Sequence, residues 1–256
     1  MGFGKIEGIW EDWICRRYKV EMLFYTIDIA HGLARLDEEE SRHLLTVLRR
    51  GVGDAVSFTD GKGRFYDAEI AEAGKKQAVL RIVSETVADA ERPARLHLAI
   101  APTKNIDRIE WLLEKATEIG VDKITLLHCK RSERTVVRLD RLQKVLVSAM
   151  KQSMRATLPE LVGPVLFKTF VETCNEPLRC IGWLPEEMPP HLTTFLKGEP
   201  RDVVVAIGPE GDFTPEEVAM ALEKGFEPVS LGKARLRTET AGLYAVTGVV
   251  LGWERK

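Results

Sequence analysis

Cysteine is scarce in this 256-residue chain, and the features of secreted and membrane proteins are missing. The four cysteines are irregularly spaced, with no C-x-x-C pair and no histidine at zinc-ligand spacing. No run approaches the roughly 20 apolar residues of a membrane span, and the N-terminus lacks the apolar core and cleavage site of a signal peptide. We therefore expect reduced thiols, no bound metal, no membrane association and a cytoplasmic location.

Overall charge also shows no excess of one sign, since the formal net charge is -2. That balance argues against a nucleic-acid partner, but the local distribution differs. Between positions 130 and 155 eight basic residues accompany two acidic ones, Glu133 and Asp140. Such an excess is typical either of a phosphate-binding surface or of a solvated helix face, and charge alone does not separate the two. The eight are Lys130, Arg131, Arg134, Arg138, Arg141, Lys144, Lys151 and Arg155.

The composition, with 45% hydrophobic and 30% charged residues, is typical of a globular protein. The chain is long enough for two domains. Residues 1–21 show no regular pattern and are interpreted as an N-terminal extension. Residues 22–88 read mostly as short strands, which predicts a small β-barrel-like domain. The expected strands are 23–27, 55–59, 64–70 and 78–83, with a turn at 60–63 and one helix at about 38–50. A polar segment ending in Pro93, residues 86–93, is the predicted linker.

Residues 94–256 instead alternate strands with helices, which predicts an α/β domain with a largely parallel sheet. Strands are expected at 96–101, 124–128, 179–184, 203–207 and 228–231. Helices are expected after residue 105 and ending at Gly120, at about 140–156, after Thr214, and at 243–251.

Two loops at the ends of predicted strands are candidate ligand sites, because open α/β sheets bind ligands at the carboxyl ends of their strands. The first, Ile207–Gly211, leads into a helix start in which Thr214, Pro215 and Glu217 form a capping pattern. By itself this loop favours an ordinary β-to-α turn, since any such turn uses glycine and proline. The second, Leu231–Ala241, holds three basic residues and one carboxylate and is longer than a connection requires. Neither loop matches G-x-G-x-x-G or a P-loop.

Several segments in order carry a resemblance to a known family, and they span nearly the whole chain from about residue 23. The segments are HLLTVLRRGVGD (43–54), DGKGRFYDAEI (60–70), EKATEIGVDKI (114–124), KQSMRATLPEL (151–161), IGPEG (207–211) and LRTETA (236–241). They resemble the SPOUT, or α/β-knot, methyltransferases, and among them the RsmE family, which methylates N3 of a uridine in small-subunit (16S) ribosomal RNA.

The resemblance implies a PUA-like RNA-binding β-barrel at 22–88 and a SPOUT trefoil-knot domain at 94–256 that forms a homodimer. The apolar last helix would then contribute to the subunit interface, although a buried core helix would have the same sequence. S-adenosyl-L-methionine is the implied cofactor, held largely by backbone groups in the knot. The implied cofactor-binding residues are Leu184, Ile207, Gly208, Pro209, Glu210, Gly211, Leu231, Gly232, Leu236 and Arg237.

One departure from the family pattern concerns the turn after Leu231-Gly232. Members often have a proline-arginine pair where this chain has Lys233-Ala234, followed by Arg235. The role of an arginine at this turn is therefore open.

Methyl transfer to uracil N3 needs a deprotonated nitrogen, so the site has to favour the anionic base or supply a proton acceptor. The hypothesis is that Arg237 stabilises the developing anion and that Glu239 orients Arg237 or assists proton removal. A structural pair of these two residues is the alternative. Phosphate contacts are expected from Arg49, Arg50, Lys104, Arg131 and Arg155. Rival interpretations are a SPOUT enzyme acting on another RNA and a non-catalytic RNA-binding factor of ribosome assembly.

Overall fold

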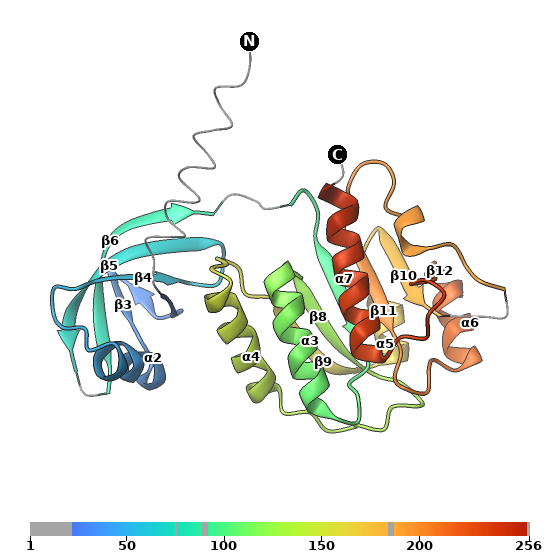
Figure 1. Cartoon of the computed structure of the whole chain (residues 1–256), viewed down its shortest axis with the longest axis horizontal. Coiled ribbons are helices and arrows are strands. Elements are labelled where there is room, and N and C mark those ends of the chain that lie inside the picture. The colour runs from blue at the N-terminus through green and yellow to red at the C-terminus, as the bar shows by residue number, and fades with distance from the viewer. Residues whose placement is uncertain (1–21, 75, 89–91, 184–186, 255–256) are drawn as a thin grey trace, which may run out of the picture. The chain divides into compact units, whose positions relative to one another are not determined.

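The chain forms two compact units in a computed structural model (Figure 1). The structure describes residues 22–74, 76–88, 92–183 and 187–254. As far as it is described, the smaller unit comprises residues 22–88 and 150–158, and the larger comprises 92–149 and 159–254. The sequence pattern assigned residues 150–158 to the larger domain, whereas in the structure they pack with the smaller unit. The predicted extension at 1–21 lies outside the described residues.

The smaller unit is a six-stranded sheet around an apolar core. Its order is β1-β4-β5-β6-β3-β2, and every neighbouring pair is antiparallel except β1 with β4. Phe58 and Tyr66 stack in the core with ring centroids 4.7 Å apart. The strands are β1 (Leu23–Tyr25), β2 (Ile29–Ala30), β3 (Leu33–Arg35), β4 (Ala55–Thr59), β5 (Arg64–Ala73) and β6 (Ala78–Val87). The expectation of a small β-domain is confirmed, while the short hairpin β2–β3 was not predicted.

The helix expected at 38–50 is shorter and changes type. Asp37 caps α2 (Glu38–Arg42) by accepting a hydrogen bond from Glu40 N. The chain then widens into a π-helical turn, η1 (His43–Val47), in which Leu48 N donates to His43 O at 3.0 Å. Arg49 has a φ of 57°, a left-handed conformation that a helix does not continue through.

Residues 150–158 belong to the smaller unit because they bond to its 60–63 turn. Gly63 N donates to Ala156 O at 3.0 Å, and Leu158 N donates to Gly61 O at 2.9 Å. Lys151 also forms an ion pair with the buried Glu40. The basic helix α4 (Leu139–Gln152) therefore ends earlier than the predicted 156.

The larger unit is a six-stranded, wholly parallel sheet of order β12-β10-β11-β7-β8-β9. Its two central strands, β7 and β11, are buried at every position, as continuous apolar runs predict for a sheet covered on both faces. The strands are β7 (Leu96–Ile100), β8 (Lys123–His128), β9 (Glu160–Leu166), β10 (Leu178–Gly182), β11 (Val203–Ile207) and β12 (Glu227–Val229). The predicted α/β domain with a largely parallel sheet is confirmed.

Helices cover both faces of this sheet (Figure 1). On one face α3 (Ile106–Ile119) and α7 (Thr238–Glu254) pack against each other, and α7 packs on β7 and β11. On the other, α5 (Phe167–Thr173) and α6 (Pro215–Glu223) form an apolar core with alternate residues of the strands. A single 3₁₀ turn, η2 (Leu192–Thr194), contacts α7. Neither β9 nor α5 was predicted. No helix within the described ranges is long and apolar enough to cross a membrane.

Short-range signals explain where these helices begin and end. Asn105 caps α3 by accepting a hydrogen bond from Asp107 N, and Gly120 ends it with a φ of 104°, a left-handed conformation that glycine adopts without strain. Thr214 and Glu217 form the predicted capping box of α6. The last helix begins at Thr238, five residues before its predicted start, because its first turn includes the polar end of the second loop.

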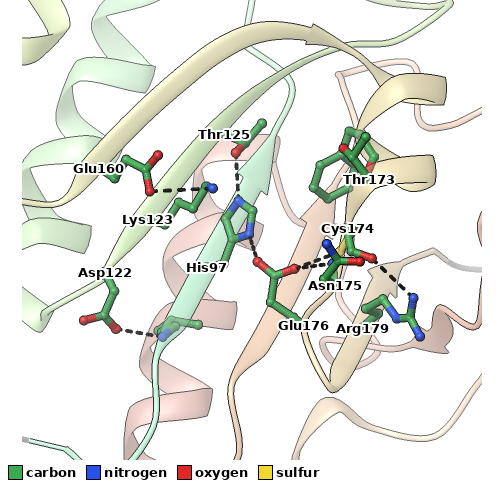
Figure 2. Close-up of polar contacts among 12 residues, drawn as sticks. His97, Asp122, Lys123, Thr125, Glu160, Thr173, Cys174, Asn175, Glu176 and Arg179 are labelled. Carbon is green, nitrogen blue, oxygen red and sulfur yellow. Dashed lines mark hydrogen bonds and ion pairs between the residues drawn. The ribbon is translucent and has the colours of Figure 1, made fainter.

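A partly buried polar cluster joins the strands near their amino ends (Figure 2). His97 of β7 lies between two partners, with Nδ1 2.5 Å from Glu176 Oε1 and Nε2 2.8 Å from Thr125 Oγ1. Glu176 Oε2 accepts hydrogen bonds from Asn175 N and Cys174 Sγ. The bond from His97 and the other donors lower the pKa of Glu176 to about 2. Since this carboxylate is ionised, His97 Nδ1 carries the proton and donates.

Glu176→Gln tests this cluster, and we expect it to lower the free energy of unfolding at pH 7 by about 1–2 kcal/mol. Because folding lowers the pKa of Glu176 from 4.5 to about 2, its stabilisation is complete above about pH 4.5 and is lost as pH falls toward 2. The difference between wild type and variant in urea unfolding should narrow over that range. Glu172→Gln, an exposed carboxylate nearby, is the control and should change stability little. If the difference in free energy of unfolding between wild type and Glu176→Gln did not change with pH, the stabilising role of the ionised Glu176 would be contradicted.

Candidate active site

The carboxyl ends of three neighbouring strands form the floor of a cavity. In the parallel register Gly182 of β10 lies beside Ile207 of β11 on one side and Val229 of β12 on the other. All three residues line a cavity of about 700 Å³. A Cβ atom at position 182 would lie 3.1 Å from Ile207 Cδ1, so glycine here keeps the strand ends close and the backbone accessible.

Both predicted loops border this cavity, and most of the predicted cofactor residues lie on its wall. Gly211 is not among the lining residues, and Leu184 lies outside the described residues. Glu239 faces a neighbouring hollow instead. The predicted residues on the cavity wall are Ile207, Gly208, Pro209, Glu210, Leu231, Gly232, Leu236 and Arg237.

The loop after β11 is held from both sides by the loops that follow β7 and β8. Glu210 Oε1 accepts a hydrogen bond from Lys104 N at 2.9 Å. Arg131 Nη1 donates to Gly211 O at 2.7 Å, and its Cβ lies 3.3 Å from where a Gly211 Cβ would stand. Glu217 Oε1 accepts from Lys130 N at 2.8 Å while Glu217 Oε2 completes the helix cap. The loop is therefore rigid because charged side chains bind neighbouring backbone.

The cavity wall is apolar at its floor and charged at its rim. Four cations and two carboxylates line it, namely Arg108, Lys233, Arg235, Arg237, Glu210 and Asp212. Asp212 follows the glycine of the loop with a φ of 62° and accepts a hydrogen bond from Phe213 N at 2.8 Å. Burial raises the pKa of Asp212, against the lowering effect of that bond and of nearby Arg131 and Arg235.

Arg237 and Glu239, the predicted catalytic pair, stand at the junction of the second loop with α7. Arg237 is exposed and lines the cavity. Glu239 is buried, and its Oε1 forms an ion pair with Arg108 Nη1 of α3 at 3.7 Å. Arg108 also lines the cavity but was absent from the predicted site. The structure thus adds a second arginine to the place where charge was expected.

Sequence reasoning missed other lining residues for different reasons. Gly182 and Trp183 stand where a strand was expected to continue to 184, although the glycine was an available sign of a strand end. Asp212 directly follows IGPEG and could have been included with it. Arg108 gave no such sign, because only the packing of α3 against α7 brings it to the cavity.

The basic segment 130–155 is largely engaged in internal contacts. Arg131 and Arg134 bind backbone carbonyls of the loops after β11 and β7. Others pair with acids, including Arg141 with Glu110 of α3 at 2.8 Å between Nη2 and Oε2. The members with such contacts are Lys130, Arg131, Arg134, Arg138, Arg141 and Lys151. Much of the local charge excess therefore has a structural role.

The described residues contain no group of three or more His, Cys, Asp or Glu side chains placed to hold a metal ion. Three cysteines, Cys129, Cys174 and Cys180, are free and buried. Burial raises the pKa of each thiol to about 12, so none of the three is a nucleophile at neutral pH.

Comparison with known proteins assigns the family. Residues 90–250 match the model of an RNA methyltransferase domain, and residues 36–83 match that of an RNA methyltransferase PUA domain. The chain is 34% identical to ribosomal RNA small subunit methyltransferase E of Synechocystis sp. over 233 residues, which cover 86% of this chain and 74% of the relative. The chain belongs to the RsmE family of RNA methyltransferases.

Solved structures agree with the RsmE assignment. A probable rRNA-methyltransferase from Porphyromonas gingivalis is 39% identical with a TM-score of 0.85, covering 91% of this chain and 98% of the other. Ribosomal RNA small subunit methyltransferase E from Neisseria gonorrhoeae, solved with S-adenosyl methionine, is 30% identical with a TM-score of 0.78 and the same coverage. The SPOUT and PUA-like fold classes implied by the sequence resemblance are confirmed.

Proposed function

We propose that this protein transfers a methyl group from S-adenosyl-L-methionine to N3 of a uridine in small-subunit ribosomal RNA, in the cytoplasm. The observation that carries the proposal is the cavity at the ends of β10, β11 and β12, which combines the IGPEG and LRTETA loops in one RsmE-family fold. A relative of this family was solved with S-adenosyl methionine. The well-formed cavity favours an enzyme over a non-catalytic assembly factor.

The floor of the cavity suits the adenosine part of the cofactor. Its floor is made of glycine backbone and aliphatic side chains, which accept an adenine ring and hydrogen-bond it through main-chain groups. Positions 182, 208 and 232 are glycines, and any side chain at 208 would meet Phe213 at 3.2 Å. Glu210 and Asp212 at the rim supply negative charge beside a sulfonium or an amino group. Ile207, Leu231 and Leu236 would enclose the adenosine.

When bound, S-adenosyl-L-methionine supplies an electrophilic methyl group. In the proposed reaction the bond from sulfur to methyl carbon breaks as the bond to uracil N3 forms, and the N3 proton leaves to a base. Arg237, on the cavity wall, stabilises the negative charge on the uracil carbonyl oxygens. Glu239 accepts the N3 proton or holds Arg108 in position, since it already pairs with that arginine.

We propose that RNA phosphates bind both units. Arg49, Arg50 and Arg155 belong to the smaller, PUA-like unit, whereas Lys104 and Arg131 belong to the larger. Lys104 is 78% exposed at its side chain and pairs with Glu133 at 3.0 Å, an exposed pair that phosphate would readily replace. Arg131 donates a hydrogen bond to Gly211 O in the loop after β11, which borders the cavity. A substitution of Arg131 that lowers RNA affinity would therefore also change the conformation of this loop.

A homodimer of the larger unit is part of the same proposal. The last helix α7 is apolar on several sides, and its Tyr244 and Leu251 stay exposed although eight other residues of the helix are buried. A helix whose apolar residues exceed what its own core covers is suited to a subunit contact.

The decisive measurement is the position of the methyl group. Purified protein, ribosomal small subunits from cells lacking the enzyme and labelled S-adenosyl-L-methionine should yield 3-methyluridine in a nuclease digest analysed by mass spectrometry. Methylation of a ribose, of another base or of transfer RNA would contradict the proposed specificity. It would favour the alternative of a SPOUT enzyme with a different RNA target. Absence of both methylation and cofactor binding would favour the non-catalytic factor.

Arg237→Ala should lower the rate of methyl transfer about 100-fold, because removing one donor to a developing anion has an effect of this size. Lys168→Ala removes an exposed cation of α5 that is not among the residues lining the cavity and is the control, expected to change the rate little. Single-turnover rates of folded variants would measure both. Transfer by Arg237→Ala near the wild-type rate would end the catalytic assignment.

Arg131→Ala should weaken cofactor binding about 3- to 10-fold, because the Gly211 carbonyl loses its donor and the loop loosens. Lys130→Ala is the control, since it removes only an exposed side-chain pair with Glu216 at 3.5 Å and keeps the backbone bond to Glu217. Isothermal titration with S-adenosyl-L-methionine measures both. If only RNA affinity falls in Arg131→Ala, Arg131 is a phosphate ligand and not a support of the loop.

A further inference from the structure

A second hollow adjoins the cavity on the side of α3 and α7. We refer to it as the Trp111 hollow, and it is lined among others by Arg108, Trp111, Arg235, Leu236, Arg237 and Glu239. It encloses about 630 Å³. Arg108 and the segment Arg235–Arg237 line both spaces, so the hollow and the cavity lie on two sides of the same residues. A molecule in the hollow would therefore lie next to one in the cavity.

Trp111 is an exposed aromatic wall of this hollow. It stands one turn after Arg108 on α3, so both side chains lie on the same face of the helix. With 44% of its surface exposed, Trp111 presents a ring that the fold itself does not cover. An aromatic ring beside several arginines is the chemistry with which proteins bind an unstacked nucleobase.

A buried carboxylate oxygen without a hydrogen-bond donor belongs to Glu239, one of the residues that line the same hollow. The side chain of Glu239 is only 9% exposed, and Oε2 is buried with no hydrogen-bond partner among the described residues. Its other oxygen pairs with Arg108. A buried acceptor in this state destabilises the protein unless a donor reaches it, which marks the place where a ligand N–H would bind.

We infer that the Trp111 hollow binds the flipped-out target uracil, stacked on Trp111 with its N3–H directed to Glu239 Oε2. The Watson–Crick edge of uracil has an acceptor, a donor and an acceptor in sequence. The two carbonyl oxygens would then face Arg108 and Arg237, and N3 would lie between them at the carboxylate. The inference rests on the proposed function and adds to it a place for the base and a residue, Trp111, that positions it.

The character of the wall favours a nucleotide over a second copy of this chain. Only Trp111 and Leu236 are apolar among the residues that line the hollow, and the others are charged or polar. Subunit contacts instead concentrate apolar residues at their centre and exclude charge. A polar hollow with one aromatic wall is what base recognition requires.

Two variants of Trp111 test the inference. Trp111→Ala should raise KM for RNA about 10- to 100-fold, the effect of losing one stacked base, with S-adenosyl-L-methionine affinity unchanged. Trp111→Phe should restore most of the activity because it keeps a stacking surface. Leu222→Ala, another exposed apolar residue, is the control and should leave KM unchanged.

A fluorescence measurement covers the case in which the alanine variant does not fold. A short RNA containing the target uridine should quench the tryptophan emission of the wild type more than that of Trp111→Phe. The same RNA with 3-methyluridine, which has no N3–H, should quench Trp111 less. The inference would be overturned if Trp111→Ala had the same KM for RNA as the wild type, or if RNA quenched the wild type and Trp111→Phe equally. The proposed function would still stand in that case, provided that the wild-type protein methylates the uridine. A halved mass in light scattering for either variant would assign Trp111 to a subunit contact.

Discussion

The register of three parallel strands is the constraint on which the site depends. Because Gly182, Ile207 and Val229 fall in one row, the loops that leave β10, β11 and β12 begin beside one another. Ile207 and Val229 are buried, and glycine between them keeps the row narrow. A shift of one residue in any strand would turn these side chains to the opposite face and separate the loops. The position of the cavity is therefore determined first by the register of the strands, and the loops then form its walls.

Charged side chains then hold what the register brings together. Arg131, Arg134 and Glu210 each bond to main-chain groups of a neighbouring loop, so three loops brace one another around the strand ends. Bonds of this kind involve one ionised partner and are stronger than neutral ones. This also explains why a basic segment occurs in a protein of net charge -2. Its arginines act on carbonyl groups of the fold as well as on any phosphate.

Sequence was most informative where a signal is local. The capping box at Thr214, the end of α3 at Gly120 and the strand at 203–207 were all predictable, because each depends on a few consecutive residues. The strand β9 was not predicted. It contains Gly163 and Pro164, which disfavour a strand in general, but β9 is an edge strand, where proline is tolerated.

The contribution of Arg108, Trp111 and the orientation of Glu239 could not be predicted, for a different physical reason. They come from helices more than 120 residues apart in sequence, and only helix packing unites them. From the sequence, the glutamate of the LRTETA motif was paired with Arg237, whereas the structure pairs Glu239 with Arg108. The pairing of Glu239 with Arg108 depends on tertiary packing, and neither the hydrophobic periodicity nor the motif could predict it.

That pairing is incomplete, and its incompleteness bears on catalysis. One oxygen of Glu239 lies 3.7 Å from Arg108 Nη1, longer than a hydrogen bond, and the other is buried without a donor among the described residues. An unsatisfied buried acceptor destabilises a fold by about 1–3 kcal/mol. The fold retains it next to the cavity, where a donor on a ligand would recover that free energy. A uracil N3–H is such a donor, and the contact would align the nitrogen for proton loss at the atom that accepts the methyl group.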